Sequence, residues 1–152
     1  MTDDTAAINS AISSGSRCVE GAPGCQSSTT SPAVVYFPAG TYLVSSSILP
    51  YYMTQLIGDP NHMPVIKATA GFTGLGLVDG GHYGSSVPDY VTVNVFYRQI
   101  RNLVFDTTNI PPGSYATGIH WPTAQATSVQ NCVFQLSQAK PNIHVGIFIE
   151  NG

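Results

Sequence analysis

Residues 100–105 read Ile-Arg-Asn-Leu-Val-Phe, and residues 129–134 repeat the pattern as Val-Gln-Asn-Cys-Val-Phe, 29 residues later. A second pair of markers, Gly118-Ile119 and Gly146-Ile147, recurs after 28 residues. A period of roughly 20 to 50 residues built from short apolar segments is typical of a solenoid, in which each repeat buries its apolar face against its neighbours. Because the segments are rich in Val, Ile and Phe, they predict an all-β fold. The expected form is a single-stranded right-handed parallel β-helix of about four to five coils.

Equivalent residues of neighbouring coils stack in such a fold, because successive coils lie about 4.8 Å apart. Asn102 is then expected beside Asn131, where stacked amides can hydrogen-bond to each other. Phe105 is expected beside Phe134 in the interior. The alternative is a β-sandwich in which two strands are similar by chance.

Turn residues separate the apolar segments and divide the chain into coils. Residues 79–90, with several glycines and a proline, are interpreted as an excursion from the solenoid. The expected coils span residues 34–58, 65–78, 91–105 and 116–134, and a fifth begins at residues 143–149.

The first thirteen residues predict a short amphipathic helix. Thr2-Asp3-Asp4-Thr5 supplies N-cap residues and acids for the first turn, and the apolar pairs Ala7-Ile8 and Ala11-Ile12 follow at helical spacing. A helix within residues 1–13 can cap one end of the solenoid and protect its edge from pairing with other chains. The two aspartates are interpreted as capping residues, and a metal or catalytic pair is the alternative.

The composition favours a neutral, hydroxyl-rich partner such as a polysaccharide. Only 9% of the 152 residues are charged, against about 25% in ordinary soluble domains, so polar uncharged side chains cover much of the surface. The five Lys and Arg residues are scattered and form no basic stripe, which argues against binding to nucleic acid or to an anionic membrane. No cofactor is expected.

The three cysteines predict an extracellular protein. Cys18 and Cys25 flank a short Gly/Pro segment inside a polar loop, residues 14–33, and are close enough in sequence to form a local disulfide. A disulfide indicates an oxidising compartment, so secretion is expected. Cys132 lies in an apolar segment and is expected to be a buried free thiol. The sequence contains no recognisable signal peptide, transmembrane run or N-glycosylation motif.

Several stretches resemble a known enzyme family. Residues 2–8 and 35–42 look like the opening of the pectate-lyase-like β-helix superfamily. Three further stretches resemble fungal exo-β-1,3-glucanases of glycoside hydrolase family 55, and the likeness runs along nearly the whole chain. They are Phe96–Asn102, Gly118–Trp121 leading into Gln125–Asn131, and His144–Gly152.

The resemblance implies a larger enzyme, because members of this family carry two β-helix domains side by side with a glucan cleft between them. It implies that residues 1–152 are a partial N-terminal β-helix of a secreted glucan 1,3-β-glucosidase, truncated at both ends. The second domain, which carries the catalytic glutamate of the family, is then the missing partner, and this chain alone is expected to be inactive on β-1,3-glucan.

The resemblance also implies a role for Gln125, since family members use amide and hydroxyl side chains of this domain to position the attacking water. The alternative is an amide that satisfies turn backbone. His120 is a further candidate for sugar contact. Trp121 can stack on a pyranose ring, and a core position is the equal alternative.

Inverting glycoside hydrolysis requires two carboxyl groups about 6.5 to 9.5 Å apart. No two acids share a motif outside the helix cap, so no catalytic residue is expected in this chain beyond the weak candidates Gln125 and Glu150. His120 and His144 have no partners at metal-ligand spacing, so no metal site is expected. Two other functions stay open, a pectin-active β-helix enzyme and a non-catalytic carbohydrate-binding or adhesive β-helix.

Overall fold

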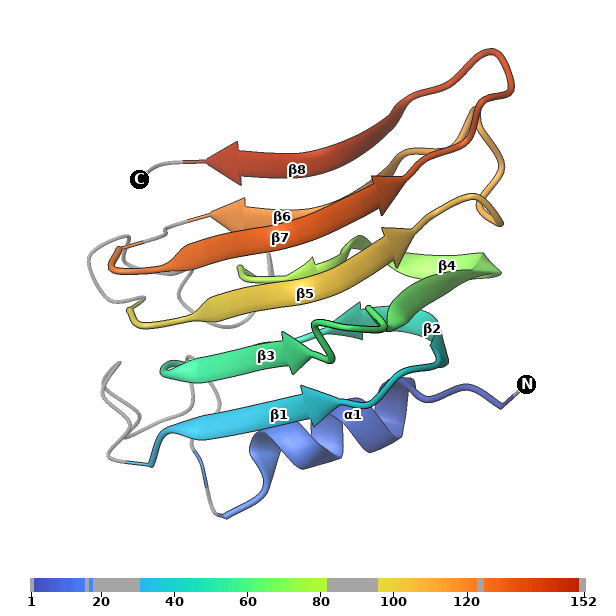
Figure 1. Ribbon diagram of the computed structural model, residues 1–152. Helices are drawn as coiled ribbons and strands as arrows, with labels where there is room; N and C mark the ends of the chain where they lie inside the picture. The colour runs from blue at the N-terminus through green and yellow to red at the C-terminus, as the bar shows by residue number, and fades with distance from the viewer. Residues whose placement is uncertain (1, 16, 18–30, 82–95, 123–124, 151–152) are drawn as a thin grey trace.

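The computed structural model describes residues 2–15, 17, 31–81, 96–122 and 125–150. All strand pairings in this part of the chain are parallel (Figure 1). The elements are α1 (Thr5–Ser13), β1 (Ala33–Phe37), β2 (Thr41–Ile48), β3 (Thr54–Gly58), β4 (Val65–Asp79), β5 (Gln99–Asp106), β6 (Ala116–Pro122), β7 (Ser128–Gln135) and β8 (His144–Glu150).

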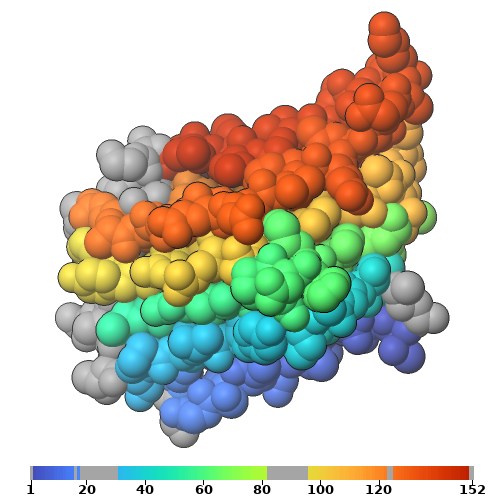
Figure 2. Space-filling view, in the orientation of Figure 1, coloured from blue at the N-terminus to red at the C-terminus, as the bar shows by residue number. Residues whose placement is uncertain are grey.

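The strands form the coils of a parallel β-helix, as predicted. Each coil contributes two strands, β1 with β2, β3 with β4, β5 with β6, and β7 with β8. The first stack of paired strands runs through β1, β3, β5 and β7. A second runs from the start of β2 through the start of β4 to the ends of β5 and β7. A third runs from the end of β2 through the end of β4 to β6 and β8. Figure 2 shows the coils as successive layers.

The predicted coil boundaries were wrong, although the apolar segments themselves are strands. Gln55–Gly58 was expected to close the first coil, but it pairs with β1 and therefore opens the second. Strand β6 closes the third coil, because it pairs with the end of β4 below and with β8 above. The described chain thus completes four coils. Each coil holds several similar apolar segments, so a segment's composition does not identify the stack to which it belongs.

Asparagines make the turn between the first and second stacks in two neighbouring coils. Asn102 and Asn131 both have a left-handed backbone, with φ of 59° and 49°. Their amides stack as predicted, since Asn131 Nδ2 donates to Asn102 Oδ1 at 2.9 Å. Asn102 Nδ2 in turn donates to the Gly58 carbonyl of the coil below, at 3.2 Å. Asparagine tolerates this backbone region better than most residues, so one residue makes the corner.

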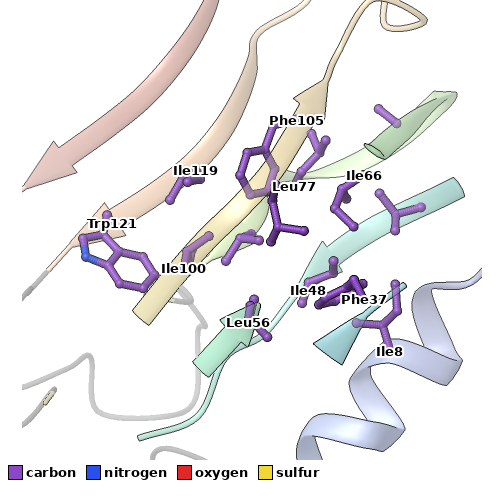
Figure 3. Packing of buried hydrophobic residues seen from close by; sticks show 14 of the residues in the cluster. Ile8, Phe37, Ile48, Leu56, Ile66, Leu77, Ile100, Phe105, Ile119 and Trp121 are labelled. Atoms are coloured by element: carbon purple, nitrogen blue, oxygen red, sulfur yellow. The ribbon is translucent and has the colours of Figure 1, made fainter. Parts of the chain in front are cut away.

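The interior is an apolar column that follows the axis of the coils. The rings of Phe105 and Phe134 stack with centroids 5.6 Å apart, which confirms the predicted pair. Phe105 is fully buried, whereas Phe134, in the fourth coil, is half-buried. Figure 3 shows the column from the helix upward through Ile8, Phe37, Ile48, Leu56, Ile66, Leu77, Ile100, Phe105, Ile119 and Trp121.

The predicted capping helix is present as α1, which lies beside the first coil (Figure 1). Its buried residues Ile8 and Ile12 join the core. The two aspartates act differently from a simple N-cap. Asp3 Oδ1 accepts the Thr5 N–H at 3.0 Å, while Asp4 uses Oδ2 to accept the backbone N–H of Leu43 in β2, also at 3.0 Å. The aspartates therefore attach the helix to the first coil.

Cys132 is a free thiol, as predicted, but it is half-buried rather than fully enclosed. Burial raises the pKa of this thiol above its ordinary value. Cys18 and Cys25 lie outside the described residues, so their pairing stays a prediction. In the described part of the chain, no helix combines the length and the hydropathy needed to cross a membrane.

Candidate functional site

Three successive coils place Asp79, His120 and Glu150 in one row. Asp79 ends β4, and its register partner is His120 in β6. The register partner of His120 in β8 is Phe148, and Glu150 lies two residues further along that strand. Residues two apart in a strand point to the same face, so Glu150 can reach back to the imidazole.

The imidazole of His120 bridges the two carboxylates. Its Nδ1 lies 2.7 Å from Asp79 Oδ1, and its Nε2 lies 3.3 Å from Glu150 Oε2. Asp79 Oδ1 also accepts the Gly81 N–H at 3.0 Å. The side chains of His120 and Asp79 are 0% and 5% exposed, whereas that of Glu150 is 31% exposed. The row therefore leads from a buried acid to a partly exposed one.

The two contacts restrict the orientation and the protonation of the imidazole. An ionised carboxylate only accepts hydrogen bonds, so a contact of Nδ1 with an ionised Asp79 requires a proton on Nδ1, and a contact of Nε2 with an ionised Glu150 requires a second proton on Nε2. Stacking of the imidazole on the Phe148 ring, with centroids 5.5 Å apart, holds its plane. Because the imidazole fills the space between Asp79 and Glu150, a glycosidic oxygen and a water cannot lie between these two acids.

Asp79 also borders a cavity of about 520 Å³, which is lined in part by Asn9 of helix α1. The cavity lining combines polar side chains with two leucines and a glycine. Its lining residues are Asn9, Ser46, Ser47, Leu49, Thr73, Gly74, Leu75 and Asp79.

Trp121 occupies the core position that was the alternative to sugar stacking. Its side chain is in the buried cluster, and Nε1 donates to Thr127 Oγ1 at 3.1 Å. The Arg98 guanidinium carbon lies 4.9 Å from the centre of the ring, and Arg98 itself is buried. A flat face open to a sugar is therefore missing from the described surroundings of Trp121, and its contact with substrate stays a prediction.

Gln125 lies three residues beyond the end of β6 and pairs with Phe96 in an isolated parallel bridge. It is half-buried at a corner where the backbones of Ala126 and Tyr97 both have positive φ, 50° and 58°. This position is compatible with the turn role and with the water-positioning role, and the latter stays a prediction. The side chain of His120 is fully buried, so a ligand that approaches this row contacts Glu150 first.

The remaining histidine of interest, His144, serves the fold. Its Nδ1 lies 2.9 Å from Thr107 Oγ1, and its Nε2 lies 3.3 Å from the Pro111 carbonyl. Within the described ranges, no group of three His, Cys, Asp or Glu side chains is arranged to hold a metal ion.

Most of the described basic side chains are buried or form an ion pair within the chain. Arg17 and Arg98 are buried, and Lys67 forms an ion pair with Asp106. Burial alone raises the pKa of Asp106, but hydrogen bonds from Lys67 and Thr108 outweigh it and hold that pKa below its ordinary value. Lys140 is exposed and Arg101 is half-buried, which is little positive charge for binding an acidic polymer.

Sequence reasoning missed Asp79, which was placed at the start of the excursion. The stacked positions along the row hold Asp, His and Phe, three unlike residues, so no repeat marks them. The available signal was an acid directly after a buried apolar strand and before Gly80-Gly81. A carboxylate in that setting needs partners from neighbouring strands.

Comparison with known proteins gives a match along the whole chain. A family model described as rhamnogalacturonase A/epimerase, pectate lyase-like, matches residues 1–152. A protein of Cochliobolus carbonum named glucan 1,3-beta-glucosidase is 50% identical over all of this chain, which covers 19% of that protein. A probable glucan endo-1,3-beta-glucosidase of Arthroderma benhamiae is also 50% identical, with 99% of this chain and 17% of the relative covered.

A third relative carries a different name. The non-secreted LysM effector LysM19 of Penicillium expansum is 50% identical over all of this chain, which covers 12% of that protein. The chain thus spans a fifth or less of the length of each of these relatives.

Proposed function

This chain belongs to the rhamnogalacturonase A/epimerase, pectate lyase-like family, and from that premise we propose that it is the β-helix part of an enzyme acting on β-1,3-glucan. The observation that carries the proposal is 50% identity to two relatives, over 100% and 99% of the chain. One is named glucan 1,3-beta-glucosidase and the other probable glucan endo-1,3-beta-glucosidase. One of these names specifies endo action. The exo-acting, inverting form rests on the resemblance to glycoside hydrolase family 55.

The surface chemistry supports a neutral glycan over an acidic one. Of the five basic residues, two are buried and a third is neutralised by Asp106, so a pectin-type polyanion finds few cationic partners. The alternative of pectin activity is favoured only by the name of the family model. A non-catalytic carbohydrate-binding module is the third candidate function.

We expect the 152-residue chain alone not to hydrolyse glucan, because its described acids are bound by other groups of the fold. Each of them already has a hydrogen-bond partner within the chain. The six are Asp3, Asp4, Asp59, Asp79, Asp106 and Glu150.

Incubation of the purified chain with laminarin, followed by glucose measurement, checks this expectation. No glucose above the buffer control is expected. Glucose release that persists through purification and disappears in Glu150→Gln would contradict it and place a catalytic acid in this chain.

Affinity electrophoresis separates the three functions. Laminarin in the gel is expected to slow the chain, while polygalacturonate is not. Retardation by polygalacturonate alone selects the pectin alternative. Retardation by laminarin, together with no turnover by a longer protein that contains this chain, selects a binding module.

Secretion is proposed with the function, and its support is the predicted Cys18–Cys25 disulfide. Thiol alkylation under denaturing, non-reducing conditions, followed by peptide mapping, should label Cys132 and leave the other two unlabelled. Labels at positions 18 and 25 would remove this support, and the name of the non-secreted relative would then gain weight.

A further inference from the structure

We propose that the carboxylate of Glu150 binds hydroxyl groups of a neutral saccharide, and that His120 and Asp79 are positioning residues that hold it in place. This inference rests on the proposed function. It assigns the sugar contact to the exposed end of the three-residue row, rather than to the buried ring of Trp121.

Glu150 has unused capacity for hydrogen bonds. Only its Oε2 contacts the imidazole, and its Oε1 has no hydrogen-bond partner within the described part of the chain. An ionised carboxylate can accept about four hydrogen bonds, and hydrogen bonds to a charged acceptor are stronger than those between neutral groups. Sugar hydroxyls are donors, and the 31% exposure of the Glu150 side chain leaves room for them.

The two buried members of the row fix the direction of that carboxylate. Asp79 Oδ1 contacts Nδ1 of His120 at 2.7 Å, and the ring stacks on Phe148, so its orientation is fixed from two sides. The opposite nitrogen, Nε2, is therefore aimed at Glu150, and it can donate to that carboxylate when the imidazole carries both protons. A carboxylate held in advance loses less conformational entropy when a ligand binds, so the row can raise affinity without touching the ligand.

A purely structural row is the competing explanation, since the contacts also tie three coils together. The two explanations differ in binding. If the contacts of the row are only structural, a substitution at Asp79 changes the stability of the chain. If they position Glu150, the same substitution lowers the affinity for saccharide, and it does so only while Glu150 is present.

Titration calorimetry with laminaripentaose tests the role of Glu150. Glu150→Gln keeps the shape and removes the charge, and it should weaken binding roughly tenfold, the loss expected for a charged hydrogen bond. Asp59→Asn is the matched control. It removes one negative charge at a turn after β3, where Asp59 Oδ1 accepts the Asn61 N–H, and it should leave binding unchanged. If the parent chain binds and Glu150→Gln binds equally well, this inference is overturned while the proposed function stands. If the parent chain does not bind, both are overturned.

A double-mutant cycle tests the positioning role. Asp79→Asn should weaken binding several-fold in the parent chain and cause no further loss in the Glu150→Gln background. Equal losses in both backgrounds would make Asp79 a structural residue and overturn its proposed role.

Nitrogen-15 NMR of the parent chain gives a readout that does not depend on the stability of any variant. Laminaripentaose should shift the Nε2 resonance of His120 through Glu150. Saturating ligand without such a shift would overturn the coupling between the two residues.

Discussion

Among single residues, Asn102 combines two properties that a tight β-helix corner requires. Its backbone adopts the left-handed region at φ 59°, and its amide connects three coils by donating to the Gly58 carbonyl and accepting from Asn131. Glycine can supply the backbone conformation alone, and alanine can supply neither property. Substitution therefore separates the two contributions.

Asn102→Gly should lower the free energy of unfolding by about 1–2 kcal/mol, the value of the lost hydrogen bonds. Asn102→Ala should cost about 1 kcal/mol more, because alanine is strained in the left-handed region. Urea denaturation followed by circular dichroism measures both. Equal losses for the two variants would show that the backbone conformation contributes little.

The stacked phenylalanines should differ in their contribution to stability. Phe105 is fully buried, so Phe105→Ala should cost about 3–5 kcal/mol. Phe134 is half-buried, and Phe134→Ala should cost about half as much, because less apolar area returns to water. Thermal denaturation of the two variants side by side checks the order. A larger loss at Phe134 would contradict the burial seen here.

Repetition explains which of these residues could be predicted. Asn102 with Asn131 and Phe105 with Phe134 are pairs of the same residue type at one period, so sequence alone located their contacts. The bridge from His120 to Glu150 links unlike residues that are not register partners. Its formation depends on the paths of three strands, which the sequence pattern does not specify.

At the level of elements, helix α1 is attached by the residues that precede it. Asp3 accepts hydrogen bonds from the backbone and hydroxyl of Thr5 and from the Ser45 hydroxyl of β2. These bonds, that from Ser45 first, lower the pKa of Asp3 from 3.8 to about 2. The attachment of the helix is therefore sensitive to acid.

Acid should weaken this attachment in a defined pH range. The pKa of Asp3 is lower in the folded chain than in the unfolded chain. The contribution of Asp3 to stability is therefore complete above about pH 4 and is lost as the pH falls toward 2. Denaturant titrations of the parent chain and of Asp3→Asn from pH 5 to pH 2 measure it. The stability of Asp3→Asn should fall less over this range, and identical slopes would contradict the assignment.

Element boundaries were predicted less well than element types. The short apolar segments of β1, β3 and β5 were visible in the sequence, but their assignment to coils depended on corners of unequal length. Strand β4 adds to the difficulty, because its first residues pair in the second stack and its last residues pair in the third. A uniform period cannot describe such a strand.

For the whole molecule, stability should be highest in the middle coils. Strands β4, β5 and β6 have hydrogen-bonded neighbours on both sides, whereas within the described residues β7 and β8 are paired on one side only. Amide hydrogen exchange should therefore be slowest in β5 and β6 and faster in β7 and β8. Exchange detected by mass spectrometry of peptic peptides checks the order, and uniform protection would indicate a single cooperative unit.

The corner between the first and second stacks is a place where insertions and deletions can be tolerated. It contains residues 38–40 in the first coil, residues 59–64 in the second, and single asparagines in the next two, yet the strands on either side remain in register. Codons can therefore be inserted or deleted at this corner without displacing the residues that stack elsewhere. A foreign peptide placed between Asn61 and His62 would be displayed on an unchanged scaffold.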